Sequence, residues 1–250
     1  MVSIDNRVGV GPPGLFIGTA GWAIPSRHAA AAPGDGSHLK RYSRVFGAVE
    51  INSSFHRSHQ RKTYERWADA TPEGFRFAAK VPKAITHERS LAGCGPLIDA
   101  FANEVGGLGG KLAVVLVQQP ASAAPDLAVA ERFFEDLRAP VDAAIAFEPR
   151  HPAWFTAEAD AWLAERRIAR VAADPARAPG AAEPGGWSEL RYYRWHGSPR
   201  IYYSDYDEAA LAALKRRAGA DRAAGATVWC VFDNTASGAA FGDALALARL

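Results

Sequence analysis

Cysteine is scarce in this chain of 250 residues, which contains two, Cys94 and Cys230. Neither belongs to a CxxC pair or to the spacing of a metal-binding motif, so a disulfide framework is not expected and a reducing cytoplasm fits. Long apolar runs are also missing. The first fourteen residues hold no apolar stretch of signal-peptide length, and no run approaches the roughly 18 residues that span a membrane. We therefore expect a cytoplasmic protein without a membrane partner.

A large charge of one sign is absent too. The net charge is +2, which is too small to indicate a nucleic-acid coat or a membrane-surface binder.

Local catalytic motifs are missing as well. The segment after the first expected strand, GTAGW, lacks the spacing of a dinucleotide-binding turn, and neither a GxSxG nucleophile elbow nor an HxH or HExxH motif occurs. A functional site must therefore combine residues from distant parts of the sequence.

The sequence does contain a regular alternation of short apolar segments with amphipathic ones. Eight segments have the length and composition of strands: 15–20, 48–55, 75–81, 111–118, 143–148, 168–174, 191–197 and 227–234. Apolar residues at helical spacing predict helices over 126–137, 156–166, 207–217 and 237–250. The segments 25–37 and 176–189 have the composition of loops.

Eight β/α alternations in about 250 residues are what a TIM-type (β/α)8 barrel requires. An open, doubly wound sheet is the alternative, but it usually carries a glycine-rich phosphate turn after its first strand. We therefore expect an α/β fold with a single TIM-like barrel domain over residues 1–250, in which residues 1–13 form a flexible N-terminal segment.

Two of the expected strands carry a glutamate inside an apolar run, in VEINSSF (49–55) and FEPRHPAWF (147–155). Both faces of a barrel strand are buried, and side chains alternate between them. Val49 and Ile51 share one face while Glu50 lies on the other, and the same parity separates apolar from ionisable residues in most strands. The ionisable residues lie mainly towards the C-terminal strand ends, where barrel active sites are built. They are Glu50, Lys80, Glu148, Arg150, Asp174, Arg194 and His196.

Two interpretations of this set stay open. The side chains can form a structural ion-pair network, because buried charges must be paired. They can instead form a polar mouth that binds a ligand. We favour the mouth, because removing so many charges from water costs several kcal/mol each with no evident gain in stability.

A series of stretches resembles the YecE-like family of uncharacterised proteins, known as domain of unknown function 72. They are GTAGW, FGAVEINSSFHR, RWADATPEGFRFAAKVPKAITH, LVQQPAS, FEPRHPAWF, YYRWHG, YYSDYD and FDNTASGAAFGDAL, in this order from about Gly18 to the C-terminus. The resemblance implies a TIM-type barrel in one domain and no established activity. The positions that it highlights are Gly21, Trp22, Glu50, Asn52, Lys80, His87, Gln118, Pro120, Glu148, Arg150, His151, Arg194, His196, Gly197, Tyr203, Ser204 and Asn234.

The chain departs from the family pattern in three places. Many members continue after Gly-Trp with a Trp-x-x-x-Phe-Tyr-Pro segment, whereas this chain has AIPSRHAAAAP, so the loop over 23–37 should shape the mouth differently. His56 and Asp233 stand where many members have other residues. No role is carried over from the family at these two positions.

Carboxylates and a histidine in a closed mouth suit general acid/base catalysis. We expect catalytic roles for Glu148, His196 and Glu50, with Glu148 as the acid or base and His196 as the proton shuttle. Lysine and arginine side chains suit the binding of carboxylate or phosphate groups. The expected ligand-binding residues are Trp22, Asn52, Lys80, His87, Gln118, Arg150, His151, Asp174, Arg194, Tyr203 and Asn234.

The expected function is hydrolysis or isomerisation of a small anionic ligand, phosphorylated or sugar-like, without a cofactor. Two alternatives stay open besides this one, and so does the oligomeric state. A non-catalytic protein would use the same mouth to bind a metabolite or nucleic acid, although the basic segments at 57–62, 165–167 and 215–217 are typical of solvated faces. A divalent metal would indicate a phosphodiesterase- or endonuclease-like hydrolase instead. Its candidate ligands are Glu50, Glu148, Asp174, Asp233 and His196.

Overall fold

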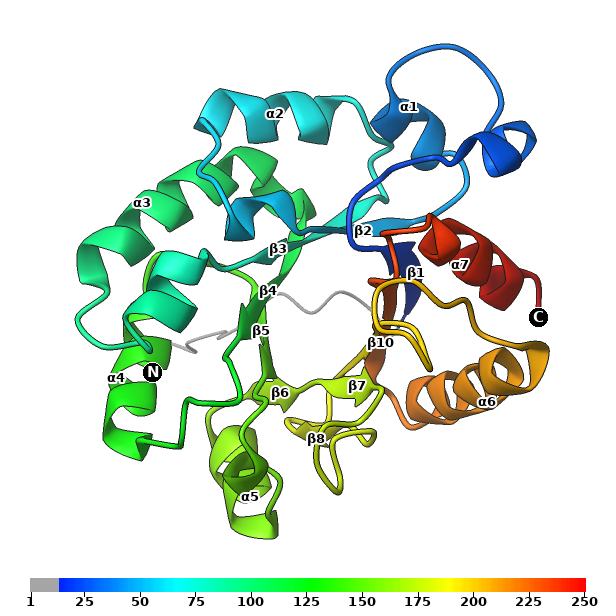
Figure 1. Ribbon diagram of the computed structural model, residues 1–250. Coiled ribbons are helices and arrows are strands. Elements are labelled where there is room, and N and C mark those ends of the chain that lie inside the picture. The colour runs from blue at the N-terminus through cyan, green and yellow to red at the C-terminus, as the bar shows by residue number, and fades with distance from the viewer. Residues whose placement is uncertain (1–13) are drawn as a thin grey trace, which may run out of the picture.

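The computed structural model describes residues 14–250. Residues 1–13, for which we expected a flexible segment, lie outside the described part. Strands occupy the centre of the molecule and helices surround them (Figure 1). One apolar cluster contains buried side chains from Ile24 to Leu247, so close packing involves nearly the whole described chain. The assignment of residues 1–250 to one domain stays a prediction.

Ten strands form two sheets within residues 14–250. The first sheet has the order β1-β10-β9-β7 and the second β2-β3-β4-β5-β6-β8. All neighbouring strands are parallel except β6 and β8, which pair antiparallel. The strands are β1 (Leu15–Thr19), β2 (Ala48–Ile51), β3 (Arg76–Lys80), β4 (Leu112–Gln118), β5 (Ala144–Glu148), β6 (Ile168–Arg170), β7 (Ala172–Asp174), β8 (Gly185–Gly186), β9 (Leu190–Trp195) and β10 (Thr227–Phe232).

The α-helices follow the strands along the chain and lie outside them (Figure 1). They are α1 (His38–Tyr42), α2 (Arg61–Asp69), α3 (Gly95–Val105), α4 (Leu127–Arg138), α5 (Ala157–Glu165), α6 (Glu208–Ala223) and α7 (Ala239–Arg249). Four of them begin at side-chain caps, because Ser37, Asp126, Thr156 and Asp207 accept hydrogen bonds from backbone N–H groups of the first turn.

Each of the eight expected strand segments contains a strand, and each of the four expected helices is present. Three segments differ in detail. The segment 48–55 ends as a strand at Ile51 and continues as the 3-10 turn η2 (Ser53–Phe55). The expected loop over 176–189 contains β8, which pairs with β6. The loop over 25–37 contains the short 3-10 helix η1 (Ser26–Ala31).

The strand pairing shows a mixed α/β fold with parallel sheets, but it does not show the closed eight-stranded barrel that we expected. The two sheets meet at two places. The segment 168–174 contributes β6 to one sheet and β7 to the other. On the opposite side, Ala20 and Glu50 form an isolated parallel bridge, so that β1 and β2 are adjacent without a continuous ladder.

Tyr42 explains why the ladder between β1 and β2 is interrupted. Its buried hydroxyl accepts a hydrogen bond from Thr19 N over 2.9 Å and donates one to Ala48 O over 3.1 Å. The hydroxyl therefore bridges two backbone groups that a regular ladder would join directly. Gly18 lies beside this contact, and a Cβ there would meet Ala48 O at 2.2 Å, so this close approach requires glycine.

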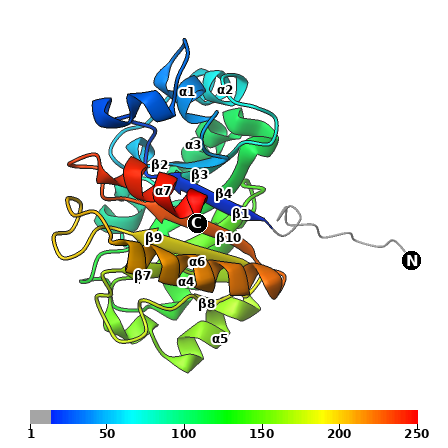
Figure 2. The ribbon, with the colours of Figure 1, turned by 90° about the vertical axis from the view of Figure 1, so that its right-hand side faces the viewer.

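The two faces of the strands separate two kinds of core, as the parity of the sequence predicts. Bulky side chains such as Ile145 and Phe147 point into the larger apolar cluster, which includes residues of the surrounding helices. A second cluster lies on the other face, where alanines such as Ala78 and Ala146 pack with larger side chains such as Leu116 and Trp229. Glu50 and Glu148 share the parity of this second cluster. The loops that follow β9 and β10 project from the same end of the molecule (Figure 2).

Candidate functional site

Charged side chains from both sheets meet at the C-terminal strand ends. Lys80 and Glu148 are the last residues of β3 and β5, while His196 and Asp233 directly follow β9 and β10. We call the following six residues the charged cluster: Glu50, Lys80, Glu148, Arg194, His196 and Asp233. None of them is more than 5% exposed. The strand order therefore brings together the residues that the sequence places on one parity.

The guanidinium group of Arg194 is the centre of the charged cluster. Its Nε and Nη2 donate to the carboxylate oxygens of Glu50 over 2.8–3.2 Å. Its Nη1 donates to Glu148 Oε2 over 3.1 Å, and its Nη2 lies 2.9 Å from Asp233 Oδ2. Burial lowers the pKa of Arg194, but the three carboxylates more than offset burial and hold the pKa above its ordinary value. One buried cation thus holds three carboxylates.

Both carboxylate oxygens of Glu50 are used inside the cluster. Arg194 contacts both, and the Tyr192 hydroxyl donates to Glu50 Oε2 over 2.9 Å. The Glu50 side chain is fully buried. These contacts are those of a structural partner of Arg194, and they give no support to the catalytic role expected for Glu50.

Glu148 is held by three cationic or imidazole groups. Its Oε2 accepts from Arg194, and its Oε1 accepts from Arg150 Nη2 over 3.1 Å and lies 3.2 Å from His196 Nε2. Burial alone would raise the pKa of Glu148, but Arg194, His196 and Arg150 hold it well below its ordinary value. Glu148 is therefore ionised at neutral pH, so it orients its partners better than it accepts a proton.

His196 lies between two carboxylates. Its Nδ1 is 3.0 Å from Asp233 Oδ2, and its Nε2 is 3.2 Å from Glu148 Oε1. Ionised carboxylates are acceptors only, so both contacts are hydrogen bonds when the ring donates from both nitrogens, as the imidazolium form does. In that form, the ring carries a transferable proton in the centre of the cluster.

Two residues of this site were not among the expected catalytic or ligand-binding residues. Asp233, which the sequence offered only as a candidate metal ligand, holds both Arg194 and His196. Tyr202 lies with its ring centre 5.8 Å from that of His196. Its backbone φ is +70°, in the left-handed region, so no side-chain pattern in the sequence could reveal this orientation. Its neighbour Tyr203, which we expected to bind ligand, is exposed and lies beneath the Arg200 guanidinium.

Lys80 differs from the other charged residues of the cluster. Within residues 14–250 its Nζ has no ion-pair or hydrogen-bond partner, and it lies 4.0 Å from the centre of the Phe55 ring. The His87 ring is 5.0 Å from the same phenyl ring. Burial and Arg194 lower the pKa of Lys80 to about 8, against the opposing effect of the three carboxylates. Burial, Lys80 and Arg150 also lower the pKa of His87.

Four more of the expected ligand-binding residues make their side-chain contacts outside the charged cluster. Asp174 accepts from the Tyr206 hydroxyl, and His151 caps a 3-10 turn by accepting from Ala153 N. Asn234 donates to Ser204 O and Asp243. Trp22 packs edge-on against Trp67, and Gln118 is buried at the end of β4, opposite Glu148.

Four cavities among the described residues have volumes of about 340 to 520 Å³, and none of these four is lined by Glu50, Lys80, Glu148, Arg194 or His196. The largest of the four, of about 520 Å³, borders the cluster through Asn52, whose Nδ2 lies 3.5 Å from Asp233 Oδ1. We call it the Trp22 cavity. Its lining includes no carboxylate: Ala20, Gly21, Trp22, Ala23, His38, Asn52, Ser53, His56, Arg57, His59 and Trp67.

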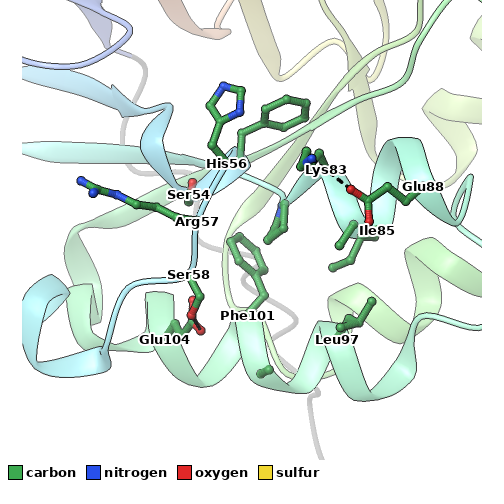
Figure 3. A pocket seen from close by; sticks show the side chains of 14 residues that line it. Ser54, His56, Arg57, Ser58, Lys83, Ile85, Glu88, Leu97, Phe101 and Glu104 are labelled. Carbon is green, nitrogen blue, oxygen red and sulfur yellow. Dashed lines mark hydrogen bonds and ion pairs between the residues drawn. The ribbon is translucent and has the colours of Figure 1, made fainter.

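A second cavity, of about 400 Å³, lies between the segment after β2 and helix α3 (Figure 3). Its walls include Ile85, Leu97 and Phe101, and the ion pair between Lys83 and Glu88 lies at one side. Because the walls are mainly apolar and carboxylates are present, this cavity suits an anionic ligand less well than the Trp22 cavity does.

Comparison with known sequences places the chain in a family. The sequence profile described as "Protein of unknown function DUF72" matches residues 16–250. The chain belongs to the DUF72 family. This result confirms the resemblance found in the sequence, and it assigns no activity, because DUF72 is defined by its unknown function.

Curated DUF72 relatives match over part of their length. UPF0759 protein YecE of Escherichia coli (strain K12) is 28% identical over 142 residues, which are 56% of this chain and 50% of YecE. UPF0759 protein YunF of Bacillus subtilis (strain 168) is 30% identical over 112 residues, 42% of this chain and 40% of YunF. The chain thus spans about half the length, or less, of the curated relatives that it matches.

Solved DUF72 structures share the fold. A DUF72 family protein from Enterococcus faecalis V583 has a TM-score of 0.79 at 20% identity, over 94% of both chains. One from Thermotoga maritima MSB8 has a TM-score of 0.76 at 22% identity, over 94% of this chain and 98% of the other. At such identities the likeness supports the fold alone.

Two further properties of this DUF72 chain bear on its partners. No helix within residues 14–250 is long and apolar enough to cross a membrane. In the same residues, no group of three or more histidine, cysteine, aspartate or glutamate side chains is placed to hold a metal ion. The carboxylates of the charged cluster instead surround Arg194.

Proposed function

We propose that this DUF72 protein is an enzyme that performs acid/base hydrolysis or isomerisation on a small anionic ligand, phosphorylated or sugar-like, at the C-terminal strand ends. The observation that carries the proposal is the Trp22 cavity. Arg57 and three histidines face a space of about 520 Å³ whose lining includes no carboxylate. Such a lining favours an anion, and the indole rings of Trp22 and Trp67 suit the apolar face of a sugar.

The charged cluster supplies the chemistry in this proposal. His196 is the proton donor, because its ring is held between Glu148 and Asp233 and can donate from either nitrogen. After His196 has given up its proton, its neutral ring becomes the proton acceptor for the return step, while Glu148 keeps the ring oriented and the Arg150 side chain shifts towards the ligand anion. Arg150 suits this movement because it is the most exposed cation in contact with Glu148, with 17% of its side chain accessible.

We also propose the finer fold and location expected from the sequence. The bridge between Ala20 and Glu50 and the shared segment 168–174 support a TIM-type barrel in which the Tyr42 hydroxyl completes the contact between β1 and β2. Cys94 and Cys230 are buried free thiols, which supports a cytoplasmic location.

Calorimetric titration with inorganic phosphate, glucose 6-phosphate and glucose tests the proposed ligand class. We expect the two phosphates to bind and glucose not to bind. Arg57→Gln should weaken phosphate binding by about 10-fold or more, because a charge-assisted hydrogen bond contributes about 1.5–3 kcal/mol. Arg132→Gln, on the exposed face of α4, is the matched control and should bind phosphate as the wild type does.

Further measurements distinguish the proposed enzyme from a non-catalytic binding protein, a nucleic-acid-binding protein and a metal-dependent hydrolase. Binding of phosphates without turnover of any sugar phosphate, followed by NMR, would indicate a non-catalytic binding protein. Tight binding of a single-stranded oligonucleotide in preference to sugar phosphates would indicate nucleic acid. Activity that requires added Mg²⁺, Mn²⁺ or Zn²⁺ would favour a metal-dependent hydrolase. Equal phosphate affinity in the wild type and Arg57→Gln would contradict the proposed anion site.

A further inference from the structure

Lys80 has the surroundings of a reactive amine rather than those of a structural cation. It is 5% exposed, yet within residues 14–250 no carboxylate lies within ion-pair distance of its Nζ. The carboxylates of the cluster are held by Arg194, with Arg150 and His196 as further partners. A buried lysine whose only role was to balance charge would be expected to contact one of them.

Groups around Lys80 act on its charge in opposite senses. The Phe55 ring, whose centre lies 4.0 Å from Nζ, and the three carboxylates favour the ammonium form, while burial and Arg194 favour the neutral amine and prevail. Arg194, a permanent cation, acts on it from within the same cluster. Desolvation and a neighbouring cation are the two conditions that turn a lysine into a nucleophile.

We propose that Lys80 is the nucleophile of this site and forms an imine with the carbonyl group of a small anionic aldehyde or ketone. This inference rests on the proposed function, because it places the ligand at the same strand ends and names its reacting group. Two cations are placed to contact a ligand anion: Arg150, which is partly exposed and pairs with Glu148, and Arg57, which lines the Trp22 cavity.

The reaction balances without any further reactant. The neutral amine of Lys80 adds to the carbonyl carbon and gives a carbinolamine. The carbinolamine then takes up one proton and releases its hydroxyl group as water, which leaves a protonated imine. His196 can supply this proton, because its ring is held as a donor between Glu148 and Asp233. Hydrolysis of the imine reverses the steps and regenerates the free amine.

The neutral fraction of Lys80 makes this step feasible near neutral pH. With a pKa of about 8, roughly a quarter of the Lys80 side chains are neutral at pH 7.5. An exposed lysine with an ordinary pKa of about 10.4 has roughly 200-fold less neutral amine at that pH. Lys83 provides the internal comparison, because its side chain is 50% exposed and pairs with Glu88 at 3.1 Å (Figure 3).

Reductive trapping tests the proposal on the full chain. The protein is incubated separately with glyoxylate, pyruvate and dihydroxyacetone phosphate in the presence of sodium cyanoborohydride, and labelled lysines are mapped by mass spectrometry. We expect at least one of the three to label Lys80 at least 10-fold faster than Lys83. The rate should rise with pH up to about 8, and glycerol 3-phosphate, which has no carbonyl group, should slow it by competition.

Lys80→Arg and Lys83→Arg are the matched variants. Lys80→Arg should remove the dominant label while its circular dichroism spectrum remains that of the wild type, and Lys83→Arg should leave the label at Lys80. Absence of label at Lys80 with all three carbonyl compounds, or labelling of Lys83 at an equal rate, would overturn the inference. If phosphate binding at Arg57 persists in that case, the proposed ligand site stands and only the imine fails.

Discussion

The buried ionisable side chains of this protein differ in the groups that surround them, and these groups decide the direction of each pKa. Glu148 and Asp233 face guanidinium and imidazole groups, which hold both pKa values low despite burial. Asp243, in α7, is also buried, but its hydrogen-bond donors are the Asn234 amide and Tyr206 N, which are neutral. Burial therefore raises the pKa of Asp243 to about 6.

This raised pKa predicts a pH dependence of stability. An unfolded aspartate has a pKa of about 3.9, so between about pH 4 and 6 the folded protein binds the Asp243 proton more tightly than the unfolded chain does. The contribution of Asp243 to the free energy of unfolding should therefore fall as the pH rises through this window, and stay constant above it. With allowance for solvent screening, the fall is about 1–2 kcal/mol.

Urea unfolding of the wild type and Asp243→Asn at pH 4, 5, 6, 7 and 8 checks this prediction. The asparagine variant lacks the titrating group, so the difference between the two proteins should change in favour of the variant from pH 4 to pH 6. The other carboxylates titrate in both proteins and cancel in the difference. A difference that is the same at every pH would show that Asp243 does not titrate in this window.

At the scale of elements, the contact between β1 and β2 depends on a residue that belongs to neither strand. Tyr42 is the last residue of α1, and its hydroxyl replaces a direct bond between the backbones of Thr19 and Ala48. Apolar patterning predicted β1 and β2 because it reports which segments are buried. It could not predict the interruption between them, because apolar patterning does not distinguish a tyrosine that bonds to strand backbones from a tyrosine that only packs in the core.

Tyr42→Phe should lower the free energy of unfolding by about 2–4 kcal/mol, because it keeps the ring but leaves Thr19 N and Ala48 O buried without a partner. Chemical denaturation measures the loss, and amide hydrogen exchange should show weaker protection in β1 and β2. Tyr203→Phe removes a hydroxyl from an exposed side chain and should change the stability by less than 0.5 kcal/mol. Equal effects of the two substitutions would contradict the bridging role of Tyr42.

Over the whole molecule, the sequence was most informative where one property was shared by many residues. The parity of polar residues in the strands predicted that Glu50, Lys80, Glu148 and Arg194 meet, because parallel strands place equivalent residues at one end. The pairing among them was not predictable. Whether Glu148 contacts Arg194 or Lys80 depends on distances across the sheets, and the contact of Tyr202 with His196 depends on a left-handed backbone.

Arg194 also connects the two sheets. It lies in β9 of one sheet, while Glu50 and Glu148 lie in β2 and β5 of the other. The ion pairs therefore join sheets that share few backbone hydrogen bonds at the Ala20 bridge. Buried pairs of this kind contribute little compared with an apolar core, but loss of one partner is costly because it leaves a buried charge unpaired.

Glu148→Gln should therefore destabilise the whole protein rather than one strand. We expect a loss of about 3 kcal/mol at pH 7, because Arg194 and Arg150 each lose an ionised partner in a buried site. For a chain of this size the loss corresponds to a fall in Tm of about 6–12 °C. Glu131→Gln, which removes a partly exposed partner of Arg166, is the control and should cost less than about 1 kcal/mol.

The pH dependence of the stability difference between wild type and Glu148→Gln shows whether the variant loses stability through the missing charge or through disturbed packing. The pKa of Glu148 is lower in the folded protein than in the unfolded chain, so the stability that its charge contributes is complete above about pH 5 and is lost as the pH falls through the folded pKa. The difference between wild type and Glu148→Gln should therefore shrink below about pH 4 in thermal melts. If the difference stays constant down to pH 3 while both proteins still unfold in one transition, the glutamine disturbs packing, and the ion pairs of Arg194 do not stabilise the contact between the sheets.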